Sequence, residues 1–247
     1  MKTIILAGGK GTRLEPYTTV LPKPLIPIGE RPILDIIIRQ LAHYGFKDIV
    51  LSVGHLSELI RAYFANGLKG LNDIKLTYVQ EDEPTGTAGS LRYISGLDDT
   101  FLVMNGDLLT TIDYNDLISY HKAKGGILTI AMHKKRVKIN LGVMETDIDG
   151  SLITYTEKPE KVYNVSMGIY VYEPEVLKYI ERNAYLDFPS LVERLLSKGE
   201  KITTYPSNDF WFDIGNHDDF IKAQSEFERL KDKILPFSSK ENMSTYS

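Results

Sequence analysis

A glycine-rich segment near the N-terminus contains the residue types best suited to binding a phosphate. Residues 6–14 read Leu-Ala-Gly-Gly-Lys-Gly-Thr-Arg-Leu and continue the apolar run 3–6. Because glycine has no Cβ, the backbone there can adopt positive φ and bring its N–H groups against phosphate oxygens. Arg13 adds a forked guanidinium that pairs well with phosphate. The segment predicts a phosphate-binding loop, with a purely structural turn between strand and helix as the alternative.

A lysine held between two prolines follows soon after this loop. Pro22 and Pro24 each restrict their own φ, so the chain around Lys23 is stiff and the direction of its ammonium group is limited. Most turn lysines are solvated. Beside a loop that already contains Arg13, however, a second phosphate-binding cation is the better interpretation of Lys23.

Two aspartates lie at the ends of apolar, strand-like runs that are far apart in the chain. Asp107 follows the run 101–104 in the segment Asn-Gly-Asp, and Asp213 lies in Trp-Phe-Asp-Ile-Gly at 211–215. Aspartate is rarely buried without a cation or donors, and Mg²⁺ takes one or two protein carboxylates together with phosphate oxygens and water. We therefore predict that both aspartates hold a shared Mg²⁺. The alternatives are a strand-end turn for Asp107 and a cap of the following helix for Asp213.

Two further segments carry groups that could recognise a base and a sugar phosphate. Residues 81–90 read Glu-Asp-Glu-Pro-Thr-Gly-Thr-Ala-Gly-Ser. Their glycines allow close backbone contact with a flat base, and their acids could accept hydrogen bonds from guanine N1–H and N2–H₂. In the segment 157–159, Glu-Lys-Pro, the lysine could neutralise a sugar phosphate while the glutamate binds hydroxyls. A capped helix start and an exposed ion pair are the respective structural alternatives.

The order of apolar and amphipathic stretches predicts the elements that must position these residues. Strand-like runs alternate with helices over the first half of the chain, which predicts a mostly parallel sheet with helices on both faces. Such sheets bind ligands beyond the carboxyl ends of their strands. After about residue 125 strands predominate. The predicted strands are 3–6, 48–53, 75–79, 101–104, 127–132, 141–145, 153–156, 165–172 and 201–205, and the predicted helices are 33–44, 56–64, 88–94, 174–180, 189–197 and 218–231.

Composition and charge restrict the class of protein. The chain has 247 residues and a net charge of −4, so no basic field favours nucleic acid as a partner. It has no cysteine, which excludes disulfides and thiolate metal sites. Without a signal-peptide pattern or an apolar run of ~20 residues, we expect a cytoplasmic protein that has no membrane partner. We expect one domain over 1–235 and a flexible tail at 236–247.

Taken together, the motifs resemble the sugar-1-phosphate nucleotidyltransferase family. LAGGKGTRL, PKP, EPTGTAG, NGD, EKP, SMGIYVYEP and FDIG occur in the order and approximate spacing of that family, across roughly residues 2–225. The resemblance implies a three-layer Rossmann-like α/β fold and the reaction of an NTP with a sugar-1-phosphate to give an NDP-sugar and pyrophosphate. It also implies Mg²⁺ as cofactor and a homo-oligomer. The nucleotide-binding region would cover about 1–125 and the sugar-binding region about 126–235.

The resemblance assigns roles residue by residue. Arg13, Lys23 and Lys158 are the expected catalytic cations, and Asp107 and Asp213 are the expected Mg²⁺ ligands. The expected nucleotide-binding residues are Leu6, Ala7, Gly8, Gly9, Gly11, Thr12, Arg13, Lys23, Glu81, Gly86, Thr87 and Ala88, and the expected sugar-binding residues are Asn105, Gly142, Glu157, Lys158 and Ser166.

The choice of base and sugar depends on finer features of these motifs. EPTGTAG looks like the guanylyltransferases for mannose-1-phosphate and heptose-1-phosphate, so GTP and one of these sugars are expected. Residues 166–168 read Ser-Met-Gly in place of Asn-Ala-Gly and look more like glucose-1-phosphate adenylyltransferases. The same chemistry with UTP, ATP, dTTP or CTP and a glucose- or hexosamine-1-phosphate therefore stays open.

Two other classes of protein fit the sequence less well. A glycosyltransferase that consumes an NDP-sugar would place Asp-x-Asp where this chain has Asn-Gly-Asp at 105–107. A non-catalytic nucleotide-sugar sensor would be expected to lack some of the two aspartates and the arginine and lysines, all of which are present.

Overall fold

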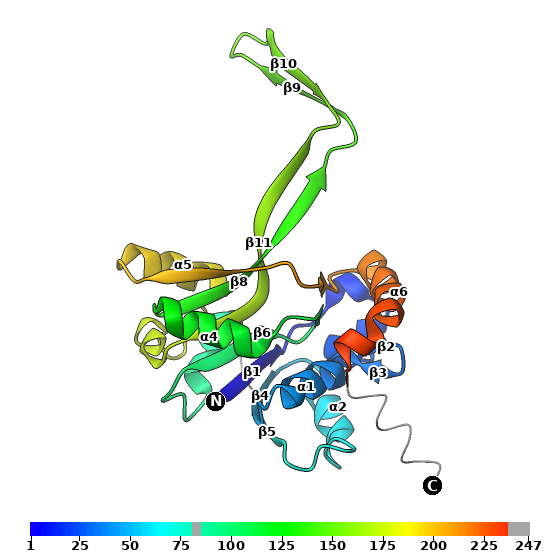
Figure 1. Cartoon of the computed structure of the whole chain (residues 1–247), viewed down its shortest axis with the longest axis vertical. Coiled ribbons are helices and arrows are strands. Elements are labelled where there is room, and N and C mark those ends of the chain that lie inside the picture. The colour runs from blue at the N-terminus through cyan, green and yellow to red at the C-terminus, as the bar shows by residue number, and fades with distance from the viewer. Residues whose placement is uncertain (81–84, 237–247) are drawn as a thin grey trace.

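The computed structural model describes residues 1–80 and 85–236, and its centre is a seven-stranded sheet (Figure 1). In spatial order the strands are β12 (Ile202–Ser207), β8 (Leu128–Lys138), β11 (Glu160–Tyr172), β6 (Phe101–Asn105), β1 (Lys2–Ala7), β4 (Asp48–Val53) and β5 (Lys75–Gln80). β11 is antiparallel to both of its neighbours, and the other pairs are parallel. The predicted mostly parallel α/β sheet is confirmed.

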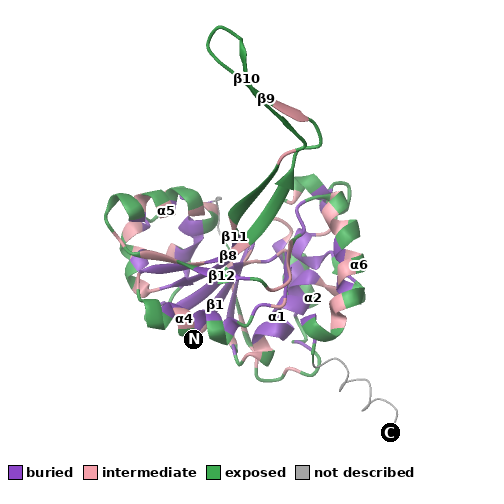
Figure 2. Ribbon diagram, turned by 45° about the horizontal axis from the view of Figure 1, so that its top comes forward, coloured by how far each residue is buried: buried purple, intermediate pink, exposed green. Residues whose placement is uncertain are grey.

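Helices cover both faces of the sheet because the central strands direct alternate residues into two apolar clusters. In β1, Ile5 belongs to one cluster and Ile4 to the other, and Met104 and Val103 divide in the same way in β6. Figure 2 shows the buried residues concentrated in the sheet and on the helix faces turned toward it. The first cluster is completed by α1 (Ile33–His43), α2 (Ser57–Tyr63), α4 (Tyr114–Lys124) and α6 (His217–Ile234), and the second by α3 (Gly86–Gly89), α5 (Phe188–Ser197) and the 3₁₀ helices η4 (Ser90–Tyr93) and η5 (Pro174–Tyr179).

Most predicted elements are present, with ends shifted by a few residues. Two predicted helices differ in kind or extent, and one helix was not predicted. The helix predicted at 88–94 is divided into the short α3 and the 3₁₀ helix η4, and the one predicted at 174–180 is the 3₁₀ helix η5. Helix α4 was not predicted, although Asp113 caps it by accepting hydrogen bonds from the backbone N–H groups of Asn115 and Asp116. Only four of its residues are buried, so its apolar stripe is narrow and easily missed.

An arm projects from this body. Strands β8 and β11 continue past the sheet as a two-stranded ribbon, much longer than the strands predicted at 127–132 and 165–172. We call residues 134–164 the arm; Figure 1 shows it pointing away from the body, and none of its residues is buried. Its far end is the hairpin of β9 (Gly142–Thr146) and β10 (Leu152–Glu157), while the other small sheets pair β2 (Pro27–Ile28) with β3 (Arg31–Pro32) and β7 (Leu108–Thr110) with β13 (Trp211–Asp213).

Two further expectations concern the C-terminal tail and a membrane-spanning segment. Apart from residue 236, the tail predicted at 236–247 lies outside the described residues. Within the portion of the chain that the structure describes, no helix combines the length and apolar character needed to cross a membrane.

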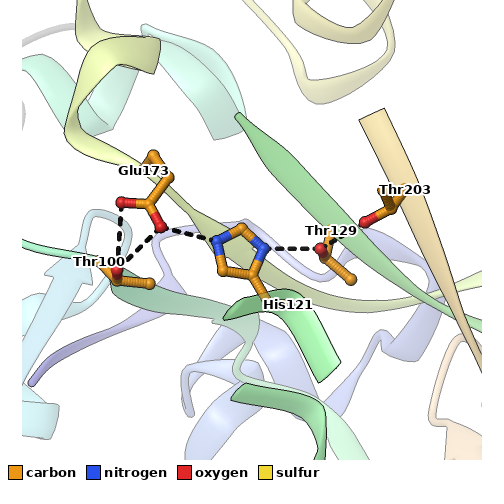
Figure 3. Close-up of polar contacts among 5 residues, drawn as sticks. All are labelled: Thr100, His121, Thr129, Glu173 and Thr203. Carbon is orange, nitrogen blue, oxygen red and sulfur yellow. Dashed lines mark hydrogen bonds and ion pairs between the residues drawn. The ribbon is translucent and has the colours of Figure 1, made fainter. Parts of the chain in front are cut away.

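A buried polar cluster holds α4 against the sheet (Figure 3). The His121 ring has Nδ1 2.6 Å from Oγ1 of Thr129 in β8 and Nε2 2.9 Å from Oε1 of Glu173. Thr129 also contacts Oγ1 of Thr203 in β12 at 2.6 Å, and Thr100 donates to Glu173 at 2.9 Å. A single imidazole therefore connects a helix, two strands and the segment after β11.

Replacing His121 with phenylalanine should destabilise the protein. Thr129 would lose a partner in the core and the partly exposed Glu173 would lose one at its edge, so the free energy of unfolding should fall by about 1–3 kcal/mol, as measured by urea denaturation. Lys122→Ala, at the exposed next position of the same helix, is the matched control. Equal stability of the two variants would show that the cluster contributes nothing measurable.

Candidate active site

A cavity of about 950 Å³ lies at the carboxyl ends of β1, β4 and β6, where the alternation of elements predicted a ligand site. It combines segments from distant regions of the chain. The lining residues are Leu6, Ala7, Gly8, Gly9, Lys10, Gly11, Thr12, Arg13, Lys23, Pro24, Ser52, Val53, Gly54, His55, Gly86, Thr87, Ser90, Asn105, Gly106, Asp107, Tyr185 and Asp187.

The glycine-rich loop leaves β1 and passes around the cavity. Gly8 and Gly9 are exposed, so their backbone is accessible to a ligand. The hydroxyl of Thr18 donates to the carbonyl of Gly11 at 3.0 Å, which closes the loop on itself. Arg13 follows at the cavity wall with an exposed side chain. The predicted loop therefore presents backbone N–H groups and one guanidinium to the same space.

Lys23 and Asp107 form an ion pair at the cavity wall, although 84 positions separate them in the sequence. Their side chains are only 11% and 23% exposed. Lys23 contacts Oδ2, whereas Oδ1 of Asp107 is buried and has no hydrogen-bond partner among the described residues. A buried carboxylate oxygen without a donor is costly. Its position beside the cavity fits a ligand to a hard cation such as Mg²⁺.

Asp213 is brought next to Asp107 by the pairing of β13 with β7. Asp213 is in register with Leu108, and the N–H of Ile214 donates to the carbonyl of Asp107 at 3.2 Å. Partial burial raises the pKa of Asp213, the Asp107 carboxylate raises it further, and Lys23 opposes both effects. The two predicted carboxylates are therefore close enough to interact through their charges.

The start of α6 excludes one interpretation left open for Asp213, whereas Asp107 does lie in a turn at the end of β6. The N-cap of α6 is Asn216, whose side chain accepts from the N–H of Asp219 at 3.0 Å, so the helix-cap interpretation of Asp213 is wrong. Among the described residues, no group of three or more His, Cys, Asp or Glu side chains is arranged to hold a metal. A Mg²⁺ at Asp107 and Asp213 would therefore need phosphate and water oxygens to complete its shell.

The segment expected to contact a base packs against the start of α5. The N–H groups of Ala88 and Gly89 donate to the carbonyl of Leu186 at 3.0 and 2.9 Å. Of the predicted residues, Gly86 and Thr87 line the cavity, whereas Ala88 is buried in the core and does not. Glu81 lies outside the described residues.

A second, smaller cavity of about 250 Å³ adjoins the first. The two share Leu6, Thr87 and Asn105 in their walls, and aromatic residues including Tyr170 and Phe188 form the rest of the smaller one. The rings of Tyr170 and Phe188 are stacked, with centroids 4.0 Å apart. The arrangement offers an apolar wall with one amide, which suits a small, partly polar ligand.

The turn at 166–168 contacts two of the residues that line this smaller cavity, Asn105 and Tyr170. Gly168 has a φ of +72°, and a Cβ there would lie 2.6 Å from Nδ2 of Asn105. The hydroxyl of Ser166 accepts from the N–H of Gly168 at 3.2 Å and donates to the hydroxyl of Tyr170 at 3.3 Å. Of the two residues predicted to bind sugar here, Asn105 lines both cavities, whereas Ser166 lines neither and contacts the wall of the smaller one through Tyr170.

The structure does not bring the other predicted sugar-binding residues to either cavity. Gly142, Glu157 and Lys158 lie in the arm. Nζ of Lys158 is 3.4 Å from Oε1 of Glu157, and both side chains are 56% exposed. This is the exposed ion pair that the sequence left open as an alternative for this segment.

Several cavity residues were missed by the sequence reasoning. Ser52, Gly54 and His55 lie at the carboxyl end of β4, the parallel neighbour of β1, so the rule that singled out Asp107 could have found them. Asp187 caps α5 by accepting from the N–H of Ser190 at 2.9 Å. Its local pattern predicts a helix start, but only the folded chain places it across from Gly86.

Comparison with known proteins identifies the family. Residues 2–229 match the nucleotidyl transferase family, and this chain belongs to it. It is 34% identical over 241 residues to UTP–glucose-1-phosphate uridylyltransferase of Synechocystis sp., covering 90% of this chain and 62% of that protein. It is also 34% identical to mannose-1-phosphate guanyltransferase of Pichia angusta, covering 98% of this chain and 69% of that protein. The chain therefore spans less than two thirds of the Synechocystis protein.

A solved structure agrees with the fold. HddC from Yersinia pseudotuberculosis superimposes with a TM-score of 0.69 at 25% identity, and the superposition covers 92% of this chain and 99% of HddC. The chain therefore shares the overall fold of HddC.

Gly86 offers a test of how tightly the base-binding segment is packed. Its φ is +84°, and a Cβ would lie 2.5 Å from the carbonyl oxygen of Leu186. Gly45 has a similar φ of +87° but has no atom within 4 Å of its Cβ position. Gly86→Ala should therefore lower the free energy of unfolding by about 1–3 kcal/mol more than Gly45→Ala, because only Gly86→Ala adds a clash to the backbone strain. Equal losses in urea denaturation would contradict the packing described here.

Proposed function

We propose that this chain catalyses nucleotidyl transfer from an NTP, with GTP favoured, to a sugar-1-phosphate of the mannose or heptose type. The observation that carries the proposal is the cleft lined by the glycine-rich loop, Arg13 and the Lys23–Asp107 pair, with the Asp213 carboxylate close enough to Asp107 to interact with it through its charge. Phosphate-binding N–H groups, cations and two adjacent carboxylates are what a triphosphate with a divalent cation requires. Family membership supports the same class of reaction.

The two cavities suggest how the substrates divide between the two regions of the chain. We place the nucleotide in the larger cavity, against the nucleotide-binding region at residues 1–125. We place the sugar in the smaller cavity, against the sugar-binding region at residues 126–235. Asn105 lies in the wall of both cavities, so it is placed to contact both substrates. This arrangement would align the sugar phosphate with the α-phosphate of the NTP.

The proposed reaction is an in-line displacement. A phosphate oxygen of the sugar-1-phosphate forms a bond to the α-phosphorus while the bond from that phosphorus to the bridging oxygen breaks, and pyrophosphate leaves with the electron pair. The attacking phosphate is already anionic, so no general base is required. Arg13 would balance charge on the departing pyrophosphate and Lys23 charge near the α-phosphate. Catalysis then comes from alignment and charge stabilisation.

Asp107 and Asp213 are the residues that would hold Mg²⁺. When bound, the ion would neutralise phosphate charge and help to orient the two phosphates. The free Oδ1 of Asp107 and the charge interaction of the two carboxylates support this assignment. Lys23 holds the other oxygen of Asp107 and so fixes the orientation of the carboxylate.

The relatives support the proposed base and sugar. Mannose-1-phosphate guanyltransferases from several organisms are 28–34% identical to this chain, and one structure of HddC is described as a complex with GMP-PN. The second candidate is a uridylyltransferase for glucose-1-phosphate, because the Synechocystis relative with that name is 34% identical.

A matrix of substrates would test the proposed reaction. Five NTPs combined with mannose-, heptose-, glucose- and hexosamine-1-phosphates should release pyrophosphate fastest with GTP and a mannose- or heptose-type sugar. A preference for UTP with glucose-1-phosphate would establish the second candidate instead. Nucleotide binding without pyrophosphate release from any pair would indicate a sensor.

The carboxylate assignment has its own test. Asp107→Asn should reduce Mg²⁺-dependent turnover by on the order of 10²-fold or more, because the substitution removes a charged ligand at the reacting phosphates. Circular dichroism should show an unchanged fold. Asp98→Asn, an exposed aspartate outside the cavity, is the matched control and should keep full turnover. Turnover close to normal in Asp107→Asn would refute the metal assignment.

A further inference from the structure

The arm holds Lys158 too far from the cavities of its own chain to act there. Ser166, where the ribbon leaves the body, is in register with Met132, and Glu160 is in register with Lys138 six positions further along. Six residues of extended strand span about 20 Å, and Lys158 lies beyond them. This is far more than a lysine side chain can cover, so the chain's own Lys158 cannot contact a sugar phosphate at Ser166 in this conformation.

The sugar end of the site lacks the positive charge that Lys158 would bring. Among the described residues that line the smaller cavity, none is a lysine, arginine or histidine. The lysines and the arginine of the larger cavity, Lys10, Arg13 and Lys23, all belong to the glycine-rich loop or the segment after it. A phosphate monoester carries a charge of about −1.5 to −2 at pH 7. The proposed second substrate would therefore enter a pocket without a cation of its own.

Among the described strands, those of the arm beyond Ser207 and His133 pair only with one another. β12 pairs with β8 only as far as Ser207 and His133, so beyond that point the ribbon has two unpaired edges. Isolated two-stranded ribbons are marginally stable in water. The arm nevertheless exposes large apolar side chains, including Leu141 at 73%, Met144 at 64% and Ile153 at 62%. A surface of this kind is typical of a protein–protein contact.

The charge of the ribbon indicates what the arm contacts. Residues 134–138 and 160–164 together carry a net charge of +4, whereas the whole chain carries −4. The remainder of a second copy is therefore acidic and complementary to the ribbon. Two copies related by a two-fold axis can make this contact twice, each arm reaching the other body.

Lys158 itself has an unusual backbone. Its φ is +46°, in the left-handed region that residues other than glycine seldom adopt. Such conformations persist where the surroundings determine them, and they cluster at functional sites. Lys158 is exposed and has a strained backbone at the junction of ribbon and hairpin. These properties are consistent with a functional role at a site outside its own arm.

We propose that two copies of this chain exchange arms, so that Lys158 of one copy completes the sugar-phosphate end of the other copy's site. Glu157 travels with it and is placed to bind sugar hydroxyls. The inference rests on the proposed function for the role of Lys158, but the exchange of arms is a separate structural statement. Each active site would then be built from two chains.

Complementation between two inactive variants tests the exchange. Asp107→Asn and Lys158→Ala, co-expressed with different affinity tags, give mixed dimers that two purification steps isolate. In an exchanged dimer, the Lys158→Ala body receives the intact arm of the Asp107→Asn chain. Each variant alone should lose most of its pyrophosphate release, and the mixed dimer should recover about half of the wild-type rate, because one of its two sites is intact.

Two controls separate exchange from simple mixing. A mixed dimer of Lys158→Ala with the double variant Asp107→Asn, Lys158→Ala has no intact arm and should stay inactive. Lys222→Ala, an exposed lysine of α6 outside the arm and both cavities, should keep wild-type activity. A mixed dimer of the single variants that stays inactive would show that each arm serves its own chain, and would overturn the proposal.

The molecular mass in solution provides a readout that does not depend on activity. Wild-type protein should sediment as a dimer, and replacement of the whole arm, residues 134–164, by an Asn-Gly turn between the paired residues His133 and Val165 should give a monomer. A monomeric wild type, or a dimer that survives this replacement, would overturn the exchange. If wild type releases no pyrophosphate from any substrate pair, the proposed function fails, while a dimer that depends on the arm would still establish the exchange.

Discussion

The ion pair between Lys23 and Asp107 is the interaction on which the arrangement of the cleft depends. It joins the loop after the glycine-rich segment to the end of β6, across 84 positions of sequence, and both side chains are largely buried. Removal of either charge would leave the other without its counter-ion, which lowers stability in such a setting although the rest of the fold does not depend on the pair. The same contact leaves Oδ1 of Asp107 free beside Asp213. A single pair thus closes the cleft and orients the carboxylate.

The two ends of the site are built with different rigidity. The nucleotide end rests on the carboxyl ends of β1, β4 and β6, which are held on both sides by neighbouring strands and packed helices. The sugar end rests on the turn at 166–168, from which the arm departs without support from the body. A site divided in this way can keep the triphosphate aligned while the groups at the sugar end come from a movable element or from another chain.

Local sequence patterns predicted a large share of this structure. The strand at 48–53 has the predicted limits, and the glycine-rich loop, Lys23 and Asp107 meet at the edge of the sheet where parallel strands bind ligands. Helix α4 was missed because few of its residues face the core, so its apolar periodicity is weak. The length of β8 was underestimated because residues 134–138 are charged and exposed, and strands are usually recognised by the apolar face that they bury.

What the sequence determined by itself were properties that belong to short segments: where glycine permits close contact with a phosphate, where prolines stiffen a lysine, and where an aspartate ends an apolar strand. These depend on covalent geometry and on nearest neighbours. Only the tertiary structure decided which segments meet. Asp213 reaches Asp107 because β13 pairs with β7, and Lys158 does not reach Ser166 because the ribbon continues straight past the sheet. Such contacts arise from packing between residues far apart in the chain, which no local pattern contains.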